Sequence, residues 1–288
     1  MTNTQTTERQ AVLQVKNLHY AYDEKKTALN GINVDIYSGE RIAIVGSNGA
    51  GKSTFFLNIN GVLTPEEGEI LFEGVPVTKK TLKQLRKNIG IVFQDADNQI
   101  VASTVKAEVS FGPMNLKLPK ETVKQRVETA MEYMNISEYG DRPPHYLSGG
   151  EKKRVAIADI IAMEPRAIIF DEPTAALDPV NAAMLEDVLT RLSAEGKTLL
   201  VSTHDVDFTY RWAERVLVFC GGEIIADGTP LEIFRNQDVV KRANLQRPMM
   251  LDVYEELVSA GLLPDDHSYP RVPSELAEIA AANRAGNE

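Results

Sequence analysis

Residues 41–60 read RIAIVGSNGAGKSTFFLNIN, and this stretch decides the fold. The short apolar run 42–45 predicts a buried strand, and residues 53–60 predict the helix that follows it. Between them, residues 46–53 fit the pattern G-x-x-x-x-G-K-[ST] of a phosphate-binding loop, in the strand, loop and helix context that the pattern requires. The sequence therefore predicts an α/β fold built around a site for a nucleotide's phosphates.

The chemistry of this loop follows from its residue types. Glycines allow the backbone N–H groups to surround phosphate oxygens, because no side chain keeps the two apart. Lys52 supplies a positive charge, and the Ser53 hydroxyl is a suitable ligand for Mg²⁺. The alternative, a glycine-rich turn that arose by chance, is disfavoured by the strand and the helix on either side.

A pair of carboxylates follows a second apolar run. Residues 167–170 read AIIF and deliver Asp171 and Glu172 to the carboxyl end of a predicted strand, where α/β sheets bind their ligands. Asp171 is expected to hold Mg²⁺ through water, and Glu172 to orient or deprotonate the attacking water in phosphoryl transfer. The alternative is a solvated helix cap, which a neighbouring phosphate loop disfavours.

Residues 147–151, LSGGE, open a predicted helix. Ser148 and the amides of Gly149 and Gly150 would present a second anion site at the N-terminus of that helix. Because the phosphate loop already surrounds its own nucleotide, the second site is expected to close over a nucleotide bound to another copy or a paralogue. An ordinary capped helix is the alternative.

Three further side chains are candidates for the same site. His204 follows a predicted strand and can hydrogen-bond the γ-phosphate and link it to Glu172 and water. Gln94 also follows a strand, and its amide oxygen can reach Mg²⁺ or the attacking water. Tyr22 precedes a charged turn and can stack on a base, although aromatic residues at such edges often only pack.

The remaining chain reads as an α/β domain with additions. Short β-rich runs at 13–15 and 32–36, with turns at Asn30-Gly31 and Ser38-Gly39, predict an antiparallel lead-in. A helical insert is expected at about residues 95–150, where residues 120–134 show the spacing of a helix. Strands and helices then alternate, which indicates a parallel core. Their predicted ranges are helix 152–163, strand 167–170, helix 179–194, strand 198–202, helix 206–213, strand 215–219, and helices 251–260 and 274–282 beyond the core.

Composition excludes several classes of protein. The 288 residues carry a net charge of −10, which disfavours extended contact with nucleic acid. No stretch approaches the roughly 18 apolar residues of a membrane-spanning helix, and residues 1–8 do not read as a secretion signal. Cys220 is the single cysteine, so the chain forms no internal disulfide.

In this order and spacing, the motifs resemble the ATP-binding cassette (ABC) family over about residues 11–235. The resemblance implies a P-loop ABC ATPase fold: an antiparallel β subdomain, a parallel-sheet core, a helical subdomain at about 95–165, and a short C-terminal helical extension at 236–288. It also implies ATP as the substrate, Mg²⁺ as the cofactor, and a second ABC ATPase chain, identical or paralogous, as the partner.

The site residues follow from the matched motifs. Those expected to bind ATP are Tyr22, Gly46, Ser47, Asn48, Gly49, Ala50, Gly51, Lys52, Ser53 and Thr54. The signature motif, which would contact the ATP of the partner chain, comprises Leu147, Ser148, Gly149, Gly150 and Glu151. The D-loop comprises Ala175, Ala176, Leu177 and Asp178. The expected catalytic residues are Glu172, His204 and Gln94, and the expected Mg²⁺ ligands are Ser53, Gln94 and Asp171.

The chain departs from the family pattern at two points. Glu151 stands where glutamine is usual, and Ala175-Ala176 replaces the more familiar Ser-Ala or Ala-Gly. Both changes leave Ser148 and the following amides in place. The two departures would affect the details of the site's activity, and they do not change the class of protein that the motifs indicate.

A narrower likeness comes from residues 93–100, FQDADNQI, and 109–116, VSFGPMNL. They resemble the segment of energy-coupling-factor importer ATPases that meets the transmembrane coupling subunit. Residues 203–208, THDVDF, and 210–213, YRWA, are more similar to the cobalt-importing branch than to the vitamin branches. The likeness implies a peripheral protein on the cytoplasmic side of the cell membrane, with a coupling subunit and a cobalt-type substrate-binding membrane subunit as partners.

Three alternatives remain open at this point. The same ATPase role with a vitamin cargo differs only in the membrane subunits. A soluble ABC ATPase acting on DNA or ribosomes would usually carry two cassettes or a long coiled coil, which this sequence lacks. A kinase built on a phosphate loop would leave the signature motif and His204 unexplained.

Overall fold

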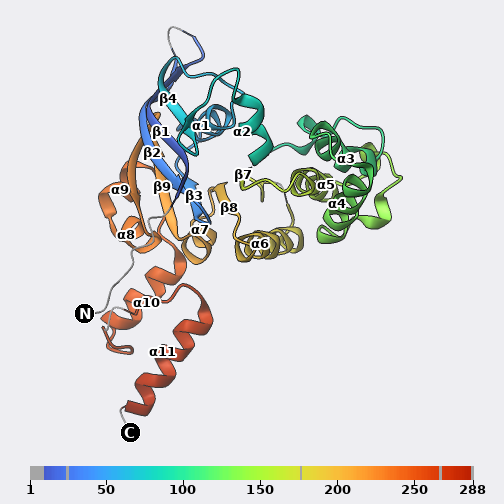
Figure 1. Ribbon diagram of the computed structural model, residues 1–288. Helices are drawn as coiled ribbons and strands as arrows, with labels where there is room; N and C mark the ends of the chain where they lie inside the picture. The colour runs from blue at the N-terminus through green and yellow to red at the C-terminus, as the bar shows by residue number, and fades with distance from the viewer. Residues whose placement is uncertain (1–9, 24–25, 176, 266–267, 287–288) are drawn as a thin grey trace, which may run out of the picture.

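The computed structural model describes residues 10–23, 26–175, 177–265 and 268–286, and it contains two β-sheets (Figure 1). A four-stranded sheet has the order β2-β1-β4-β5, and a six-stranded sheet has the order β10-β9-β3-β8-β7-β6. The strands are β1 (Ala11–Ala21), β2 (Thr27–Tyr37), β3 (Arg41–Val45), β4 (Glu67–Phe72), β5 (Val75–Pro76), β6 (Ile89–Val92), β7 (Ala167–Asp171), β8 (Thr198–Ser202), β9 (Arg215–Cys220) and β10 (Glu223–Gly228).

Eleven α-helices occur in the described part of the chain. They are α1 (Lys52–Ile59), α2 (Leu82–Asn88), α3 (Val105–Asn115), α4 (Lys120–Tyr133), α5 (Gly149–Ala162), α6 (Pro179–Ala194), α7 (Val206–Trp212), α8 (Pro230–Arg235), α9 (Gln237–Arg242), α10 (Met249–Ser259) and α11 (Pro273–Gly286). The predicted P-loop ABC ATPase fold, with an antiparallel sheet, a core sheet of mostly parallel strands and a helical insert, is confirmed.

The antiparallel sheet differs from the prediction at Asn30-Gly31, which does not form a turn. Both residues lie inside β2, where the pairing with β1 shifts register between Leu18↔Ile32 and Tyr20↔Leu29. Gly31 has a φ of 67°, and the Asn30 N–H donates to the carbonyl of Gly222 at 2.8 Å. The pair therefore makes a β-bulge, which uses the same glycine conformation that suggested a turn.

The core sheet places its functional strand ends together. β9, β3, β8, β7 and β6 run parallel, and β10 pairs antiparallel with β9 at one edge. Each of β3, β8 and β7 is almost entirely buried. Since the carboxyl ends of parallel strands meet at one edge of a sheet, the loops that follow β3, β8, β7 and β6 are neighbours.

Hydrophobic packing covers both faces of this sheet. Ala43 and Val45 belong to a cluster with α6, α7 and the helical insert, whereas Ile42 and Ile44 belong to a cluster with α1 and the antiparallel sheet. Successive residues of β3 thus point to opposite faces, as the pleat of a strand requires. Burying a Val or Ile side chain contributes about 1.5–3 kcal/mol to the free energy of unfolding. Because both faces of β3 are buried at residues 42–45, each of these positions has to be apolar, which explains the continuous apolar run.

The helical insert consists of α3, α4 and α5, which form a group to one side of the sheets (Figure 1). The predicted helix 120–134 is confirmed as α4. α3 was not predicted, because Gly112 and Pro113 interrupt the helical pattern near its end. Thr104 caps α3 by accepting the N–H of Ala107, so the helix has a defined start.

The C-terminal segment packs on the core through α7. Leu251 of α10 forms a small hydrophobic cluster with Tyr210, Phe234 and Val240, and α10 and α11 extend beyond the sheets (Figure 1). The division of the chain into domains at residue 235 stays a prediction. Among the described residues, no helix combines the length and the apolar character needed to cross a membrane.

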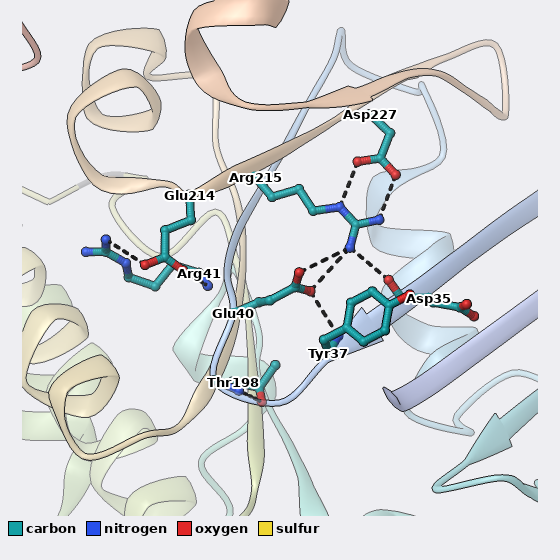
Figure 2. Close-up of polar contacts among 9 residues, drawn as sticks. Asp35, Tyr37, Glu40, Arg41, Thr198, Glu214, Arg215 and Asp227 are labelled. Carbon is teal, nitrogen blue, oxygen red and sulfur yellow. Dashed lines mark hydrogen bonds and ion pairs between the residues drawn. The ribbon is translucent and has the colours of Figure 1, made fainter. Parts of the chain in front are cut away.

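An ion-pair network closes the end of the core sheet where β3 and β9 begin (Figure 2). Arg215 Nη1 lies 3.2 Å from Glu40 Oε2, and Arg215 Nη2 lies 2.7 Å from Asp227 Oδ2. Glu40 is buried and also accepts the N–H of Tyr37 at 2.9 Å. The hydrogen bond with Asp227 raises the pKa of Arg215 above its usual value. The network ties the turn between β2 and β3 to the hairpin of β9 and β10.

One carboxyl group of the helical insert has an unusual environment. Asp159 of α5 lies close to Glu108 and Gly112 of α3, and a Cβ on Gly112 would lie 3.4 Å from Asp159 Oδ1. Burial, and secondarily the charge of Glu108, raise the pKa of Asp159 from 3.8 to about 7. Between these two values the folded state keeps a proton that the unfolded state has lost, so stability falls as the pH rises through this window.

Relative to the wild type, Asp159→Asn is therefore expected to be more stabilising at pH 8 than at pH 5, by about 1–3 kcal/mol. The amide has no proton to lose, whereas the folded wild type loses the Asp159 proton between pH 5 and pH 8, and its unfolded chain is ionised at both values. Urea unfolding at the two pH values measures the difference, with the exposed Asp187→Asn as the control. An equal change at both pH values would contradict the assigned environment.

Candidate nucleotide-binding and catalytic site

The phosphate loop lies tightly against neighbouring backbone at two glycines. Gly46 has a φ of 147°, and a Cβ there would lie 2.2 Å from the carbonyl oxygen of Phe219. Gly51 has a φ of 106°, and a Cβ there would lie 2.7 Å from the carbonyl oxygen of Ala28. A side chain would strain the backbone and displace β9 or β2 at these positions, so both require glycine.

Lys52 is almost fully buried at the start of α1. Its Nζ donates to the carbonyl oxygens of Gly46 at 2.8 Å and Ser47 at 3.3 Å. Burial lowers the pKa of Lys52, and the negative charges of Glu172 and Asp171 partly oppose that shift. The ammonium group therefore lies between the loop and the carboxylate pair, as the prediction for a phosphate-binding lysine requires.

A cavity of about 270 Å³ opens in front of the loop. Its lining brings together residues from four separate segments of the chain: Tyr22, Lys26, Thr27, Ala28, Asn48, Gly49, Ala50, Gly51, Lys52, Ser53, Thr54, Gln94 and Glu172. The Tyr22 hydroxyl lies 3.2 Å from Thr54 Oγ1, and its ring meets Tyr20 edge to face. More than half of the Tyr22 side chain is exposed, so its ring is accessible to a ligand.

The three predicted catalytic side chains meet at Glu172. Its Oε1 lies 2.8 Å from His204 Nε2, and its Oε2 accepts from Gln94 Nε2 at 3.2 Å. Glu172 itself has a φ of 44°, a left-handed conformation that a glutamate rarely adopts. Side chains that follow three different strands thus meet at one carboxylate. The backbone of Glu172 leaves the direction of the strand directly after β7.

Ser202, which the sequence analysis did not identify, holds the carboxylate pair in place. Its Oγ donates to Asp171 Oδ1 at 2.6 Å and accepts the N–H of Glu172 at 2.8 Å. Ser202 is completely buried at the end of β8, directly opposite Asp171 in the sheet. The only signal in the sequence was a hydroxyl residue directly after the apolar run 199–201 of this strand.

The oxygen donors of the site fit a magnesium ion. The carboxylate of Asp171, the hydroxyl of Ser53 and the amide oxygen of Gln94 are all hard ligands of the kind that Mg²⁺ prefers. Asp171 is buried, and Ser202 orients one of its oxygens. Gln94 uses its amide nitrogen for Glu172, which leaves its oxygen for a ligand.

The signature motif lies outside the lining of this cavity. Ser148 caps α5 in a capping box: its Oγ accepts the N–H of Glu151, and the Glu151 carboxylate accepts the N–H of Ser148 at 2.7 Å. That backbone bond lowers the pKa of Glu151. The glutamate that replaces the usual glutamine therefore has a structural role in starting the helix, and Leu147 is buried beneath it.

The signature motif and the D-loop lie side by side. A Cβ on Gly150 would lie 2.9 Å from Asn181 Nδ2 on α6. Asp178 caps that helix and binds the Asn181 side chain. The Ala175 N–H donates to the Glu172 carbonyl, and Leu177 packs on the core, whereas Ala176 lies outside the described residues. Asn181 joins the two motifs and was not predicted.

Two lysines after the signature motif connect α5 to the segment of Gln94. Lys153 is buried, and its Nζ donates to the carbonyl oxygens of Phe93 at 2.9 Å and Gln94 at 2.6 Å. Burial lowers the pKa of Lys153 to about 8. Lys152 binds Asp97 at 2.6 Å. The helix that carries the signature motif is therefore attached directly to the loop that carries Gln94.

The fold and this site define a P-loop ATPase of the ATP-binding cassette class. The phosphate loop, the carboxylate pair after β7, the histidine after β8 and the capped signature helix occur together in the helical and sheet arrangement of that class. The family model for ABC transporters matches residues 29–175. The chain belongs to the ABC transporter family.

Relatives and solved structures give the same result. The energy-coupling factor transporter ATP-binding protein EcfA of Methanothermobacter thermautotrophicus is 47% identical over 88% of this chain and 82% of its own length. CbiO1 of Clostridium perfringens, part of the ABC transporter complex CbiONQ, is 41% identical with a TM-score of 0.73, covering 87% of this chain and 99% of that one.

Two further similarities bear on length and assembly. An ATP-binding cassette bound to ADP and phosphate, in a dimeric post-hydrolysis structure, is 30% identical with a TM-score of 0.68 and covers 76% of this chain and 98% of that one. The chain spans 58% of the length of a 46% identical ABC transporter ATP-binding protein from Methanosarcina mazei, matched over 91% of this chain.

Ser202→Ala is expected to destabilise the protein by about 1–3 kcal/mol, because the buried Asp171 carboxylate loses its hydroxyl donor. ATP turnover is expected to fall about 10-fold, since Asp171 and Glu172 lose their common support. Urea unfolding and steady-state ATP hydrolysis measure the two effects, with Ser193→Ala on α6 as the control. Full turnover in Ser202→Ala would show that this support is not required.

Proposed function

We propose that the chain is the ATP-binding and ATP-hydrolysing subunit of an energy-coupling-factor ABC importer. The observation that carries the enzymatic part is the Glu172 carboxylate, bound by both Gln94 and His204 at the cavity of the phosphate loop. Similarity to EcfA, together with residues 93–100 and 109–116, supports the importer.

The proposed mechanism assigns one task to each side chain. Lys52 and the loop amides hold the phosphates. Ser53, Asp171 and Gln94 would hold Mg²⁺, which would supply positive charge to neutralise the phosphates. Glu172 orients the attacking water and accepts its proton. His204 Nε2 fixes one carboxylate oxygen of Glu172 and lies at the strand end that faces the γ-phosphate.

A second ATPase chain completes the proposed site. Ser148, Gly149 and Gly150 stand at the start of α5, outside the lining of the chain's own cavity, next to the D-loop. This arrangement supports the assignment of both motifs to a face that closes over the ATP of the partner chain. The similarity to a dimeric ATP-binding cassette with ADP and phosphate agrees with such an assembly.

The helical insert is the proposed contact with the transmembrane coupling subunit. Val101, Phe111 and Met114 are exposed apolar residues in or beside the two segments that resemble energy-coupling-factor ATPases. α5 carries the signature motif, and its Lys153 binds the loop that contains Gln94. A movement of the insert would therefore displace Gln94 relative to Glu172. The chain would then act as a peripheral protein on the cytoplasmic side of the cell membrane.

Cobalt or nickel ions are the proposed cargo. The support is the resemblance of residues 203–208 and 210–213 to the cobalt-importing branch, and the similarity to CbiO1 of the complex CbiONQ. Cargo recognition belongs to a substrate-binding membrane subunit, so a vitamin cargo requires no change in this chain's mechanism.

Glu172→Gln is expected to bind ATP normally and to hydrolyse it at least about 100-fold more slowly, because the amide cannot accept the proton of water. The purified variant is expected to become a dimer when ATP is added, since closure is no longer followed by hydrolysis. Nucleotide binding, phosphate release and size-exclusion chromatography with and without ATP measure these effects. The exposed Glu128→Gln is the matched control, and normal turnover in Glu172→Gln would remove Glu172 from its role.

Purification of the tagged chain from its own membranes in mild detergent tests the importer. Mass spectrometry is expected to identify a coupling subunit and a cobalt-type membrane subunit among the associated proteins. A vitamin-binding membrane subunit would change the cargo and keep the mechanism. Ribosomal proteins or DNA-processing factors without membrane proteins would contradict the importer.

A further inference from the structure

The C-terminal segment, residues 236–286, contacts both ends of α7, the helix that follows His204. We propose that Arg271 is a positioning residue for ATP hydrolysis, which acts on His204 through α7. Arg271 Nε donates to the carbonyl oxygen of Tyr210 at 2.7 Å, and its Nη2 donates to that of Ala213. At the other end of α7, the Met249 N–H donates to Asp207 Oδ1 at 2.6 Å. The inference rests on the proposed role of His204.

His204 occupies the connection between β8 and α7, so both elements determine its position. On the strand side, the Thr203 N–H donates to the carbonyl of Ile44 at 3.2 Å. On the helix side, the neighbouring Asp205 caps α7 by accepting the N–H of Phe208 at 2.8 Å, and its carbonyl accepts from the Thr209 hydroxyl at 2.9 Å. A shift of α7 therefore moves the residue next to His204 directly.

α7 depends on outside contacts for its own position. It has seven residues, and helices this short are not stable alone in water. The last carbonyl groups of a helix have no partner within the helix. Arg271 supplies partners for two of them, at Tyr210 and Ala213, and the buried Tyr210 side chain packs against Leu251 of α10. The C-terminal segment thus supplies both polar and apolar contacts to one face of α7.

The chain directly after α7 cannot move with it. Glu214 binds Arg41 through its carboxylate at 3.1 Å and through its N–H at 2.9 Å to the Arg41 carbonyl. Arg215 is held in the network of Glu40 and Asp227 (Figure 2). Since this end is fixed to the start of β3, loss of Arg271 would free α7 to tilt about residues 213–215 and to move its N-terminal end, where His204 lies.

The geometry of the guanidinium group gives a graded test. An arginine presents several donors in a planar fork and can bind two carbonyl oxygens at once, whereas a lysine carries the same charge on a single nitrogen. Arg271→Lys should therefore retain part of the effect, and Arg271→Ala none of it. A mere attachment of the C-terminal segment to the surface would not affect turnover in either variant.

The experiment uses the full chain and measures kcat and KM for MgATP. Arg271→Ala is expected to lower kcat about 10-fold and to change KM less than about twofold, because the residues that bind ATP are not displaced. Arg271→Lys is expected to lie between this variant and the wild type. The exposed Arg284→Ala on α11 is the matched control and is expected to behave like the wild type.

A double variant shows whether Arg271 acts through His204. In a His204→Ala background, Arg271→Ala should cause no further loss of kcat, because the residue that it positions is absent. An independent, additive loss, or an unchanged kcat in Arg271→Ala, overturns the inference and leaves the role of His204 intact. Normal turnover in His204→Ala overturns the role of His204 itself, and the inference with it.

A second contact keeps the test independent of the folding of Arg271→Ala. Met249→Pro removes the N–H that binds Asp207 and replaces an exposed side chain, at the first position of α10, where proline is tolerated. Pro248 before it already has an extended backbone, with φ −61° and ψ 137°, which suits a following proline. A lower kcat at unchanged KM in this variant supports the inference, and wild-type kinetics in it contradict control of His204 from the C-terminal segment.

Discussion

The parallel pairing of β3, β8, β7 and β6 is the constraint on which the site depends. Neighbouring strands lie about 4.8 Å apart, so side chains at adjacent strand ends are within hydrogen-bonding reach. The register places Ser202 opposite both Asp171 and Ile44. The phosphate loop, Glu172 and His204 follow directly after these strand ends. A shift of β8 by one residue would turn Ser202 to the other face and separate Asp171 from its hydroxyl donor. The apolar burial that fixes the register is therefore also what assembles the chemistry.

Electrostatic compensation follows from this arrangement. An isolated ammonium or carboxylate in a buried position costs several kcal/mol. Lys52 and Asp171 are both buried, and the negative charges of Asp171 and Glu172 offset the desolvation of Lys52. Ser202 and the loop carbonyls supply the remaining hydrogen bonds. The site is thus held ready for a ligand that brings phosphate negative charge and metal positive charge together, with little rearrangement of its own side chains.

The sequence was sufficient to predict an element where the pattern that defines it lies within a few neighbouring residues. The ranges of β8 and α6 agree with the prediction, because the apolar run 199–201, bounded by Thr198 and Ser202, and an amphipathic helix that starts with proline carry their own boundaries. Asn30-Gly31 was wrong, since a glycine with positive φ serves a bulge as well as a turn. Ser202, Asn181 and Lys153 could not be found, because their importance comes from pairing register and packing between distant segments. The motif residues that meet at Glu172 were identifiable one by one, but the sequence held no information on which of them touch.

The two ends of the core sheet differ in how firmly they are held, and this difference determines where motion is possible. At one end, Arg215 binds Glu40, Asp227 and the carbonyl oxygen of Asp35 in β2, and Arg41 binds Glu214, so the starts of β3 and β9 are tied to the antiparallel sheet (Figure 2). Strands of five residues span only about 17 Å, which is too short to bend much between their ends. Rearrangement at the opposite end is then left to the loops and to the helices that follow them. Of these, α7 is the shortest of the three helices that directly follow the site, α1, α6 and α7, and it is the one that the C-terminal segment holds at both ends. Through these contacts on α7, the C-terminal segment is connected to His204, the residue proposed to act in catalysis.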